Sequence, residues 1–330
     1  MVRRMAVPAD HRYFASATET GGRIWLVDLA IGTTIEVVTT SEAQPTGPAF
    51  SESRDGRRLL VSGRGPNGRA ALYVVDIESG TTTLLYEDWI TVCGGCLGGK
   101  LSADGSWYAF SDADGVLVGS TAGGSPTLVA SHVSRNEGDG TWQPMAWAPD
   151  GESLALWRGW ESGSEIGIVR LSTRALTIVG PGHALAWREK RPQLVITRGV
   201  TAFGGMSEIY TYDLVTAAKH DLEPIGRSNL WSPAWDPNED RFVFIQGNTL
   251  GPQNGVFTRE LGKSSATKIG TAVEFIEAWW SHDGTRVYAA VARMDLLAGA
   301  PGVANLEIVE YPGARAVASV CRQYSASSCS

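Results

Sequence analysis

Five side chains suited to ligand binding share one place in the second half of the chain, each a few residues before a recurring tryptophan. They are Trp142, His183, Trp231, Phe275 and Glu277. Aromatic rings with a few polar groups among them are typical of concave sites for small ligands or peptides. A tryptophan ring also buries a large area when it stacks on a ligand. The alternative is that these residues only pack on neighbouring loops.

Arginines recur at a second place, at or just after the end of a predicted strand. They are Arg64, Arg158, Arg198 and Arg293. Arginines around one opening bind an anionic ligand through charge-assisted hydrogen bonds. Trp160 in RGWESGSE adds an aromatic ring beside them, so the predicted ligand site includes Trp160, Arg158, Arg198 and Arg293. The alternative is that they form salt bridges between repeats, with Glu137, Asp139, Glu161 and Asp295.

The histidines make a weaker case for catalysis. The five histidines are His11, His132, His183, His220 and His282. His11 and His282 fall in predicted turns, and of the others His132 and His183 are placed to face the predicted ligand site. Two histidines are fewer than the protein ligands of a usual catalytic metal, so we predict neither a metal nor another cofactor. His183 is the one weak candidate for a catalytic base, beside an arginine that neutralises a uronate carboxylate, as in a lyase. The sequence contains no G-x-S-x-G motif, and an α/β-hydrolase mechanism has no support.

Four cysteines leave several pairings open: Cys93, Cys96, Cys321 and Cys329. We expect one or two structural disulfides in an extracytoplasmic protein, although the sequence does not select the partners. A redox CxxC motif, a zinc site and free thiols remain alternatives. The glycine-rich VCGGCLGGK lacks the βα context of a thioredoxin-like motif.

Composition excludes some classes of partner. The formal net charge is −7 and no run of lysine or arginine occurs, whereas a nucleic-acid binder needs a basic stripe. No apolar run approaches the roughly 18 residues that cross a membrane. The start of the chain, MVRRMAVPADHRYF, has no apolar segment of the kind found in signal peptides. A targeting segment outside this chain, or a cytoplasmic location, stays open.

The chain repeats one pattern along its whole length. The anchor residues are Val7, Phe50, Leu101, Trp147, Trp187, Trp235 and Trp280, at spacings of roughly 40 to 51 residues, which is typical of propeller blades. After each anchor comes a polar turn, often Asp-Gly as in Asp150-Gly151, which favours a hairpin because glycine accepts positive φ. Further apolar strands follow, and no amphipathic helix stands out. We expect the four repeat tryptophans to pack between blades.

These repeats predict a single all-β domain, a seven-bladed β-propeller with four antiparallel strands in each blade. The predicted blades are 1–43, 44–88, 89–132, 133–182, 183–226, 227–271 and 272–320, followed by a tail, 321–330. The chain would begin with an inner strand and end with an outer one, AVASVC, and blades 1 and 7 would close the ring by packing. Six blades with an irregular segment is the alternative.

The pattern xAW-x-P-D-G, followed by a YxxD-like strand, resembles the TolB-type propeller repeat. The residues that carry the resemblance are PAWDPNEDRFVF at 233–244 and MAWAPDGESLAL at 145–156. It extends over the whole chain, except that REKRP at 188–192 and PADH at 8–11 depart from the turn motif. Such repeats occur in periplasmic protein-binding proteins, in gating propellers of serine peptidases and in polysaccharide lyases, so the resemblance implies a fold and leaves the function open.

A propeller brings the start of every inner strand to one end of the central channel, here called the mouth, and the Asp-Gly turns to the other end. We therefore expect a non-catalytic propeller that binds a protein, peptide or small ligand at an aromatic and arginine-lined mouth. The alternatives are a lyase or hydrolase acting there on an anionic carbohydrate-like substrate, and an interaction module of a larger membrane-anchored protein. The sequence does not decide whether the protein is an enzyme.

Overall fold

The computed structural model describes most of the 330 residues. The parts it does not describe are 19–20, 41–48, 88–98, 133–139, 161–162, 199–206, 223–228, 239–240, 248–253, 272–274, 295–303 and 323–330, and a few side chains at strand ends. Within the described residues no helix is long and apolar enough to cross a membrane.

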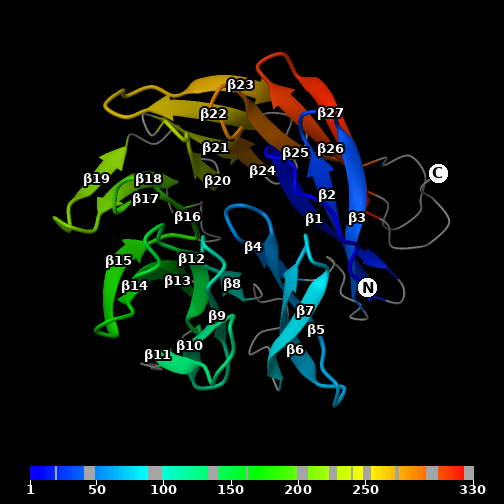
Figure 1. Ribbon diagram of the computed structural model, residues 1–330. Helices are drawn as coiled ribbons and strands as arrows, with labels where there is room; N and C mark the ends of the chain where they lie inside the picture. The colour runs from blue at the N-terminus through cyan, green and yellow to red at the C-terminus, as the bar shows by residue number, and fades with distance from the viewer. Residues whose placement is uncertain are drawn as a thin grey trace.

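Seven antiparallel sheets stand in a ring, which confirms the all-β seven-bladed propeller (Figure 1). Blades 1 to 3 contain β1 His11–Thr18, β2 Gly21–Asp28, β3 Thr33–Thr40; β4 Phe50–Glu52, β5 Arg58–Arg64, β6 Ala70–Asp76, β7 Thr81–Glu87; β8 Lys100–Leu101, β9 Trp107–Ser111, β10 Gly115–Ser120 and β11 Thr127–Ser131. Blades 4 and 5 contain β12 Gln143–Trp147, β13 Ser153–Trp160, β14 Gly163–Arg170, β15 Ala175–Pro181; β16 Ala184–Trp187, β17 Gln193–Arg198, β18 Glu208–Asp213 and β19 Lys219–Leu222. Blades 6 and 7 contain β20 Asn229–Trp235, β21 Arg241–Gly247, β22 Gly255–Glu260, β23 Thr267–Thr271; β24 Phe275–Trp280, β25 Val287–Met294, β26 Ala304–Tyr311 and β27 Arg315–Arg322.

The predicted Asp-Gly turns adopt the backbone that the sequence requires. Gly56 has φ 67° and Gly151 has φ 72°, in the region that glycine enters without a steric cost. In three of these turns the aspartate accepts a hydrogen bond from a nearby serine: Ser53 Oγ to Asp55 at 2.7 Å, Ser102 Oγ to Asp104 at 2.6 Å and Ser281 Oγ to Asp283 at 2.6 Å. Each turn joins the first two strands of its blade.

The four repeat tryptophans link neighbouring blades, as expected. The indole nitrogen of each donates to a carbonyl on the inner strand of the preceding blade. The pairs are Trp147 to Lys100 O at 2.9 Å, Trp187 to Ala146 O at 3.1 Å, Trp235 to Ala186 O at 3.1 Å and Trp280 to Ala234 O at 3.3 Å. Because Trp147, Trp235 and Trp280 are at most 9% exposed, these residues combine interblade packing with a satisfied polar atom.

Strand pairing identifies the residues that take the tryptophan position in blades 2 and 3. Trp147 pairs with Leu154, seven residues later, and Leu101 with Tyr108 has the same offset. In blade 2 that offset joins Glu52 to Leu59. The anchor of blade 2 is therefore Glu52, two residues beyond the predicted Phe50. A carboxylate replaces the indole at this place.

Blade 1 differs from the expectation of an inner strand around Val7. Its sheet holds only β1, β2 and β3, and β1 corresponds to the second strand of the other blades. The N-terminal residues instead lie on the outer edge of β3, where Val2 forms a bridge with Val38. Val2, Met5 and Val7 pack on the apolar cluster between blades 1 and 2, and this burial accounts for their outward course.

The ring closes by side-chain contacts between blades 1 and 7. Phe14 on β1 packs on Trp279 on β24 with ring centroids 6.1 Å apart, and the Thr34 hydroxyl donates to Ser319 O at 3.4 Å. Among the described strands, none of blade 7 pairs with blade 1. This agrees with closure by packing, and the last described strand is the outer strand β27.

Candidate functional site

Three charged side chains from three blades meet at the centre of the ring. Arg12 on β1 donates from Nε to Oε1 of Glu277 on β24 at 2.7 Å, and its Nη2 lies 2.6 Å from the same oxygen. Nη1 of Arg12 lies 3.2 Å from Oε1 of Glu52 on β4. With Lys100 on β8, whose pKa responds to the charges of Arg12 and Glu277, we call these four residues the central cluster.

No described strand takes the inner position of blade 1, which explains how Arg12 reaches both carboxylates. Glu277 and Glu52 belong to the inner strands on either side of blade 1, and Arg12 spans the interval between them. Its guanidinium also lies over the Trp279 ring, 5.2 Å from the centroid, a favourable cation–π contact. The three side chains are 25 to 32% exposed. They are partly open to solvent and are not sealed in a core.

Burial dominates the electrostatics of the cluster. It raises the pKa of Glu52, against the opposing charges of Arg12 and His11. It lowers the pKa of Lys100, and the positive charge of Arg12 adds to that effect. For Arg12 burial acts against the charge, but Glu277 and Glu52 together raise its pKa. Ionisable groups with perturbed pKa values are often found at functional sites.

One carboxylate oxygen in the cluster lacks a hydrogen-bond donor. Oε2 of Glu52 is buried and has no hydrogen bond among the described residues. Nε2 of His11 lies 3.9 Å from this oxygen, beyond hydrogen-bond distance. His11 uses Nδ1 to donate to the Pro8 carbonyl at 2.7 Å. Oε2 of Glu52 is thus an acceptor that the fold leaves unsatisfied.

Trp142 of the predicted mouth lies in a wedge between blades 3 and 4. It is 3% exposed and belongs to the apolar cluster of those blades. Its backbone is fixed by Ser111 Oγ, which donates to Trp142 O at 2.6 Å, and by His132 Nδ1, which accepts from Trp142 N at 3.2 Å. The guanidinium of Arg158 covers the ring at 4.7 Å. Little of this ring is open to a ligand in this structure.

Trp231 and Glu277 occupy equivalent levels of their inner strands. Trp231 pairs with Ile245, and Glu277 pairs with Ala290, in each case three residues after the partner of the repeat tryptophan. The equivalent residue in blade 4 is Gln143, which like Trp231 stands four residues before its repeat tryptophan, whereas Trp142 stands five before. Bulges in β12 and β20 each insert one residue, which brings Gln143 and Trp231 level with Glu277, three residues before Trp280. Trp231 is partly buried against the cluster of blades 6 and 7.

The other predicted mouth residues are dispersed. His183 is half-buried just before β16, where burial lowers its pKa, and its ring also interacts with the backbone of Leu230, next to Trp231. Trp160 is 37% exposed at the end of β13. The side chains of Phe275 and Arg293 lie outside the described ones, as do those of Cys93, Cys96, Cys321 and Cys329, so the predicted disulfides stay predictions.

The described arginines pair within their own blades. Arg158 contacts Glu165 through Nη2 at 2.5 Å, and Arg198 contacts Glu208 at 3.2 Å, each across neighbouring strands. Arg64 donates to the Gly68 carbonyl at 3.0 Å. Neither glutamate is among the carboxylates that the sequence suggested, which lie outside the described residues. Binding of an anion by these arginines stays a prediction.

Sequence reasoning missed Arg12, Glu52 and Lys100. Glu52 had a signal, because the Asp-Gly turn that follows it at Asp55-Gly56 has the spacing of the repeat and places the carboxylate at the tryptophan position. Arg12 had no such signal. The repeat pattern predicts an inner strand in blade 1, and Arg12 reaches Glu52 and Glu277 only because no described strand takes that position. No group of three or more metal-ligating side chains occurs in the described part of the chain.

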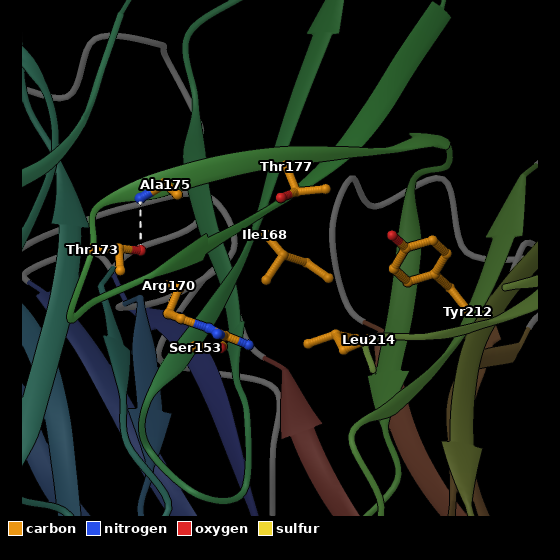
Figure 2. A pocket seen from close by; sticks show the side chains of 8 residues that line it. All are labelled: Ser153, Ile168, Arg170, Thr173, Ala175, Thr177, Tyr212 and Leu214. Carbon is orange, nitrogen blue, oxygen red and sulfur yellow. Dashed lines mark hydrogen bonds between the residues drawn. The ribbon is translucent and has the colours of Figure 1, made fainter. Parts of the chain in front are cut away.

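Hollows between blades form a different kind of feature. One of about 280 Å³ lies between blades 4 and 5, with Arg170 and Ser153 on one side and Tyr212 and Leu214 on the other (Figure 2). Another, of about 480 Å³, lies between blades 1 and 2 and includes Met1 and Tyr73. Their lining residues come from the second to fourth strands and the N-terminal segment. They are interblade grooves, separate from the central cluster.

No protein-family model matches this sequence, and no curated protein matches it. Solved structures do share its fold. TolB from Acinetobacter baumannii superposes with a TM-score of 0.55 at 14% identity, over 94% of this chain and 63% of that one. A TolB structure from Agrobacterium tumefaciens gives 0.51 at 16% identity, over 81% and 94%. Oligogalacturonate lyase from Vibrio parahaemolyticus gives 0.62 at 11% identity, over 97% and 86%.

At these identities the likeness concerns the fold alone. The chain spans less than two thirds of the Acinetobacter TolB. The same fold is indicated by the seven radial sheets, by the repeat tryptophans and by the superpositions. In fold, this chain is a TolB-like seven-bladed β-propeller.

Proposed function

We propose that this propeller is a non-catalytic binding protein that captures a protein segment, a peptide or a small ligand in its central channel. The observation that carries the proposal is the central cluster, in which Arg12, Glu52 and Glu277 converge from three blades. From blade 3 to blade 7 the inner strands are joined by tryptophans and carbonyl groups. Partly buried charges and an unsatisfied acceptor lower the stability of a fold. A role in ligand binding would account for their presence in this cluster.

The predicted mouth provides the way in. Trp231 is partly exposed at the same level of its strand as Glu277, and Trp160 and His183 add an aromatic ring and a neutral imidazole nearer the start of the inner strands. A ligand that entered past these residues would meet the charges of the central cluster. The TolB-type resemblance favours an extracytoplasmic location and a protein or peptide as the ligand.

Binding is tested with defined probes, a phage library of random octapeptides and an array of neutral and uronate oligosaccharides. We expect a ligand from either source to bind the wild-type protein, and Glu277→Gln and Trp231→Ala to weaken that binding at least tenfold. Trp107→Ala is the matched control, because Trp107 is 44% exposed on β9, outside the inner strands. Equal binding by all three variants would refute a site in the channel.

The enzyme alternative rests on two oligogalacturonate lyase structures that share the fold. If this chain were a lyase of an anionic carbohydrate, His183 is the residue that would act as base. Incubation with polygalacturonate, with and without Mn²⁺, would then form an unsaturated product that absorbs in the ultraviolet, and His183→Ala would abolish it. We expect no such absorbance from the wild-type protein.

A further inference from the structure

The innermost strand of blade 1 presents an edge that no described strand covers. β1 pairs with β2, and the bond from Leu29 N to Asp10 O sets the alternation of that ladder. The even-numbered residues of β1 therefore bond to β2, and His11, Tyr13, Ala15 and Ala17 direct their backbone N–H and C=O groups to the other edge. Among the described residues nothing pairs there.

The other six blades show what this edge lacks. In each of them the corresponding strand pairs with an inner strand, for example β5 with β4 and β25 with β24. The interval beside β1 is flanked by β24 and β4, and side chains of the central cluster cross it. An unpaired edge is a template for another extended chain.

The chemistry of Glu52 indicates what that chain would carry. In blades 4 to 7 the residue at the tryptophan position donates a hydrogen bond to the inner strand of the preceding blade. In blade 2 this residue is Glu52, which only accepts when ionised. The complementary group at the inner position of blade 1 is therefore a donor. Arg12 supplies one to Oε1, and Oε2 remains without one.

We propose that the inner edge of β1 is a strand-addition site, at which an extended segment of another protein completes blade 1 and donates from a lysine or arginine side chain to Oε2 of Glu52. The segment runs antiparallel to β1, in the direction of the other inner strands, from the mouth toward the Asp-Gly turns. This inference rests on the proposed binding function and specifies its partner as an extended basic peptide.

The test uses a synthetic nonapeptide, acetylated and amidated, with alternating threonine and valine and a central lysine. One control peptide has norleucine in place of lysine, and another has N-methyl groups along one edge, which removes the donors for strand pairing. We expect the lysine peptide to bind, with slowed hydrogen exchange at Tyr13 and Ala15. We expect the N-methylated peptide not to bind, and the norleucine peptide to bind roughly tenfold more weakly.

The protein variant is Glu52→Gln, checked for folding by its unfolding curve. It is expected to bind the lysine peptide roughly tenfold more weakly and the norleucine peptide as the wild type does. Equal binding of the N-methylated peptide, protection away from β1, or no binding of the lysine peptide would overturn strand addition. Slowed hydrogen exchange confined to residues around His183 and Trp231 would also overturn strand addition, but it would support the proposed binding function. Much tighter binding of the lysine peptide by a variant that ends at Arg322 would indicate that the chain's own last residues compete for this edge. That result would overturn the assignment of the edge to another protein.

Discussion

Arg12 and Glu277 are separated by 265 positions in the sequence and form an ion pair at 2.6 Å. Arg12 lies on the first strand of blade 1 and Glu277 on the first strand of blade 7. The pair therefore joins the two ends of the ring. Because Arg12 also contacts Glu52, one side chain connects three blades at the place where blade 1 has no inner strand among the described ones.

Arg12→Ala is expected to lower the free energy of unfolding by about 2 kcal/mol, because it leaves two partly buried carboxylates without a counter-charge. The pair is about a third exposed, and solvent keeps the loss below that of a fully buried pair. Urea unfolding measures it. In Arg12→Ala/Glu277→Gln the second change should cost less than in the wild type. Additive losses would contradict a coupling between the two residues.

Trp235→Phe is expected to cost about 1 to 2 kcal/mol, since the phenyl ring keeps most of the packing but leaves the Ala186 carbonyl without its donor. Thermal and urea unfolding both report this loss. Trp107→Phe is the comparison, because Trp107 is exposed and should change stability by less than about 0.5 kcal/mol. A similar change in both variants would show that the interblade hydrogen bond contributes little.

Alanine substitutions at two turn glycines, Gly56 and Gly151, distinguish the cost of backbone strain from that of a steric clash. Both have positive φ, 67° at Gly56 and 72° at Gly151. A Cβ atom at Gly151 meets nothing within 4 Å, whereas one at Gly56 would lie 2.0 Å from Nε2 of His11. Gly151→Ala should cost about 1 kcal/mol from the backbone alone, and Gly56→Ala clearly more. Chemical denaturation compares them, and equal losses would mean that His11 moves aside freely.

The pH dependence of stability should differ between the wild type and Glu52→Gln. The pKa of Glu52 is raised above its ordinary 4.5 in the folded protein, with burial as the main cause. The folded state thus binds the proton more tightly than the unfolded state, which favours folding at low pH. As the pH rises from 4.5 through the raised pKa, the wild type should lose stability relative to Glu52→Gln. Urea unfolding of both proteins across that range measures the difference. A constant difference would contradict a perturbed Glu52.

Much of the fold follows from local patterns in the sequence. The Asp-Gly turns, the apolar strands and the repeat tryptophans each act within one blade or between adjacent blades, so their spacing alone predicts the propeller. The hydrogen bond from Trp187 to Ala146 is one such neighbouring contact. The register of blade 2 could also be predicted from the sequence, because Glu52 precedes the Asp55-Gly56 turn by the spacing at which other blades have the repeat tryptophan.

Only the tertiary structure decided which side chains share the channel. Bulges in β12 and β20 each insert one residue, so Gln143 and Trp231, four residues before their repeat tryptophans, lie level with Glu277, three residues before Trp280. The outward course of the N-terminal segment removes an inner strand from blade 1, and only then does Arg12 contact Glu52 and Glu277. The sequence by itself determined the blades, since their periodicity is local. The central cluster depended on ring closure, which brings together residues that no local spacing relates.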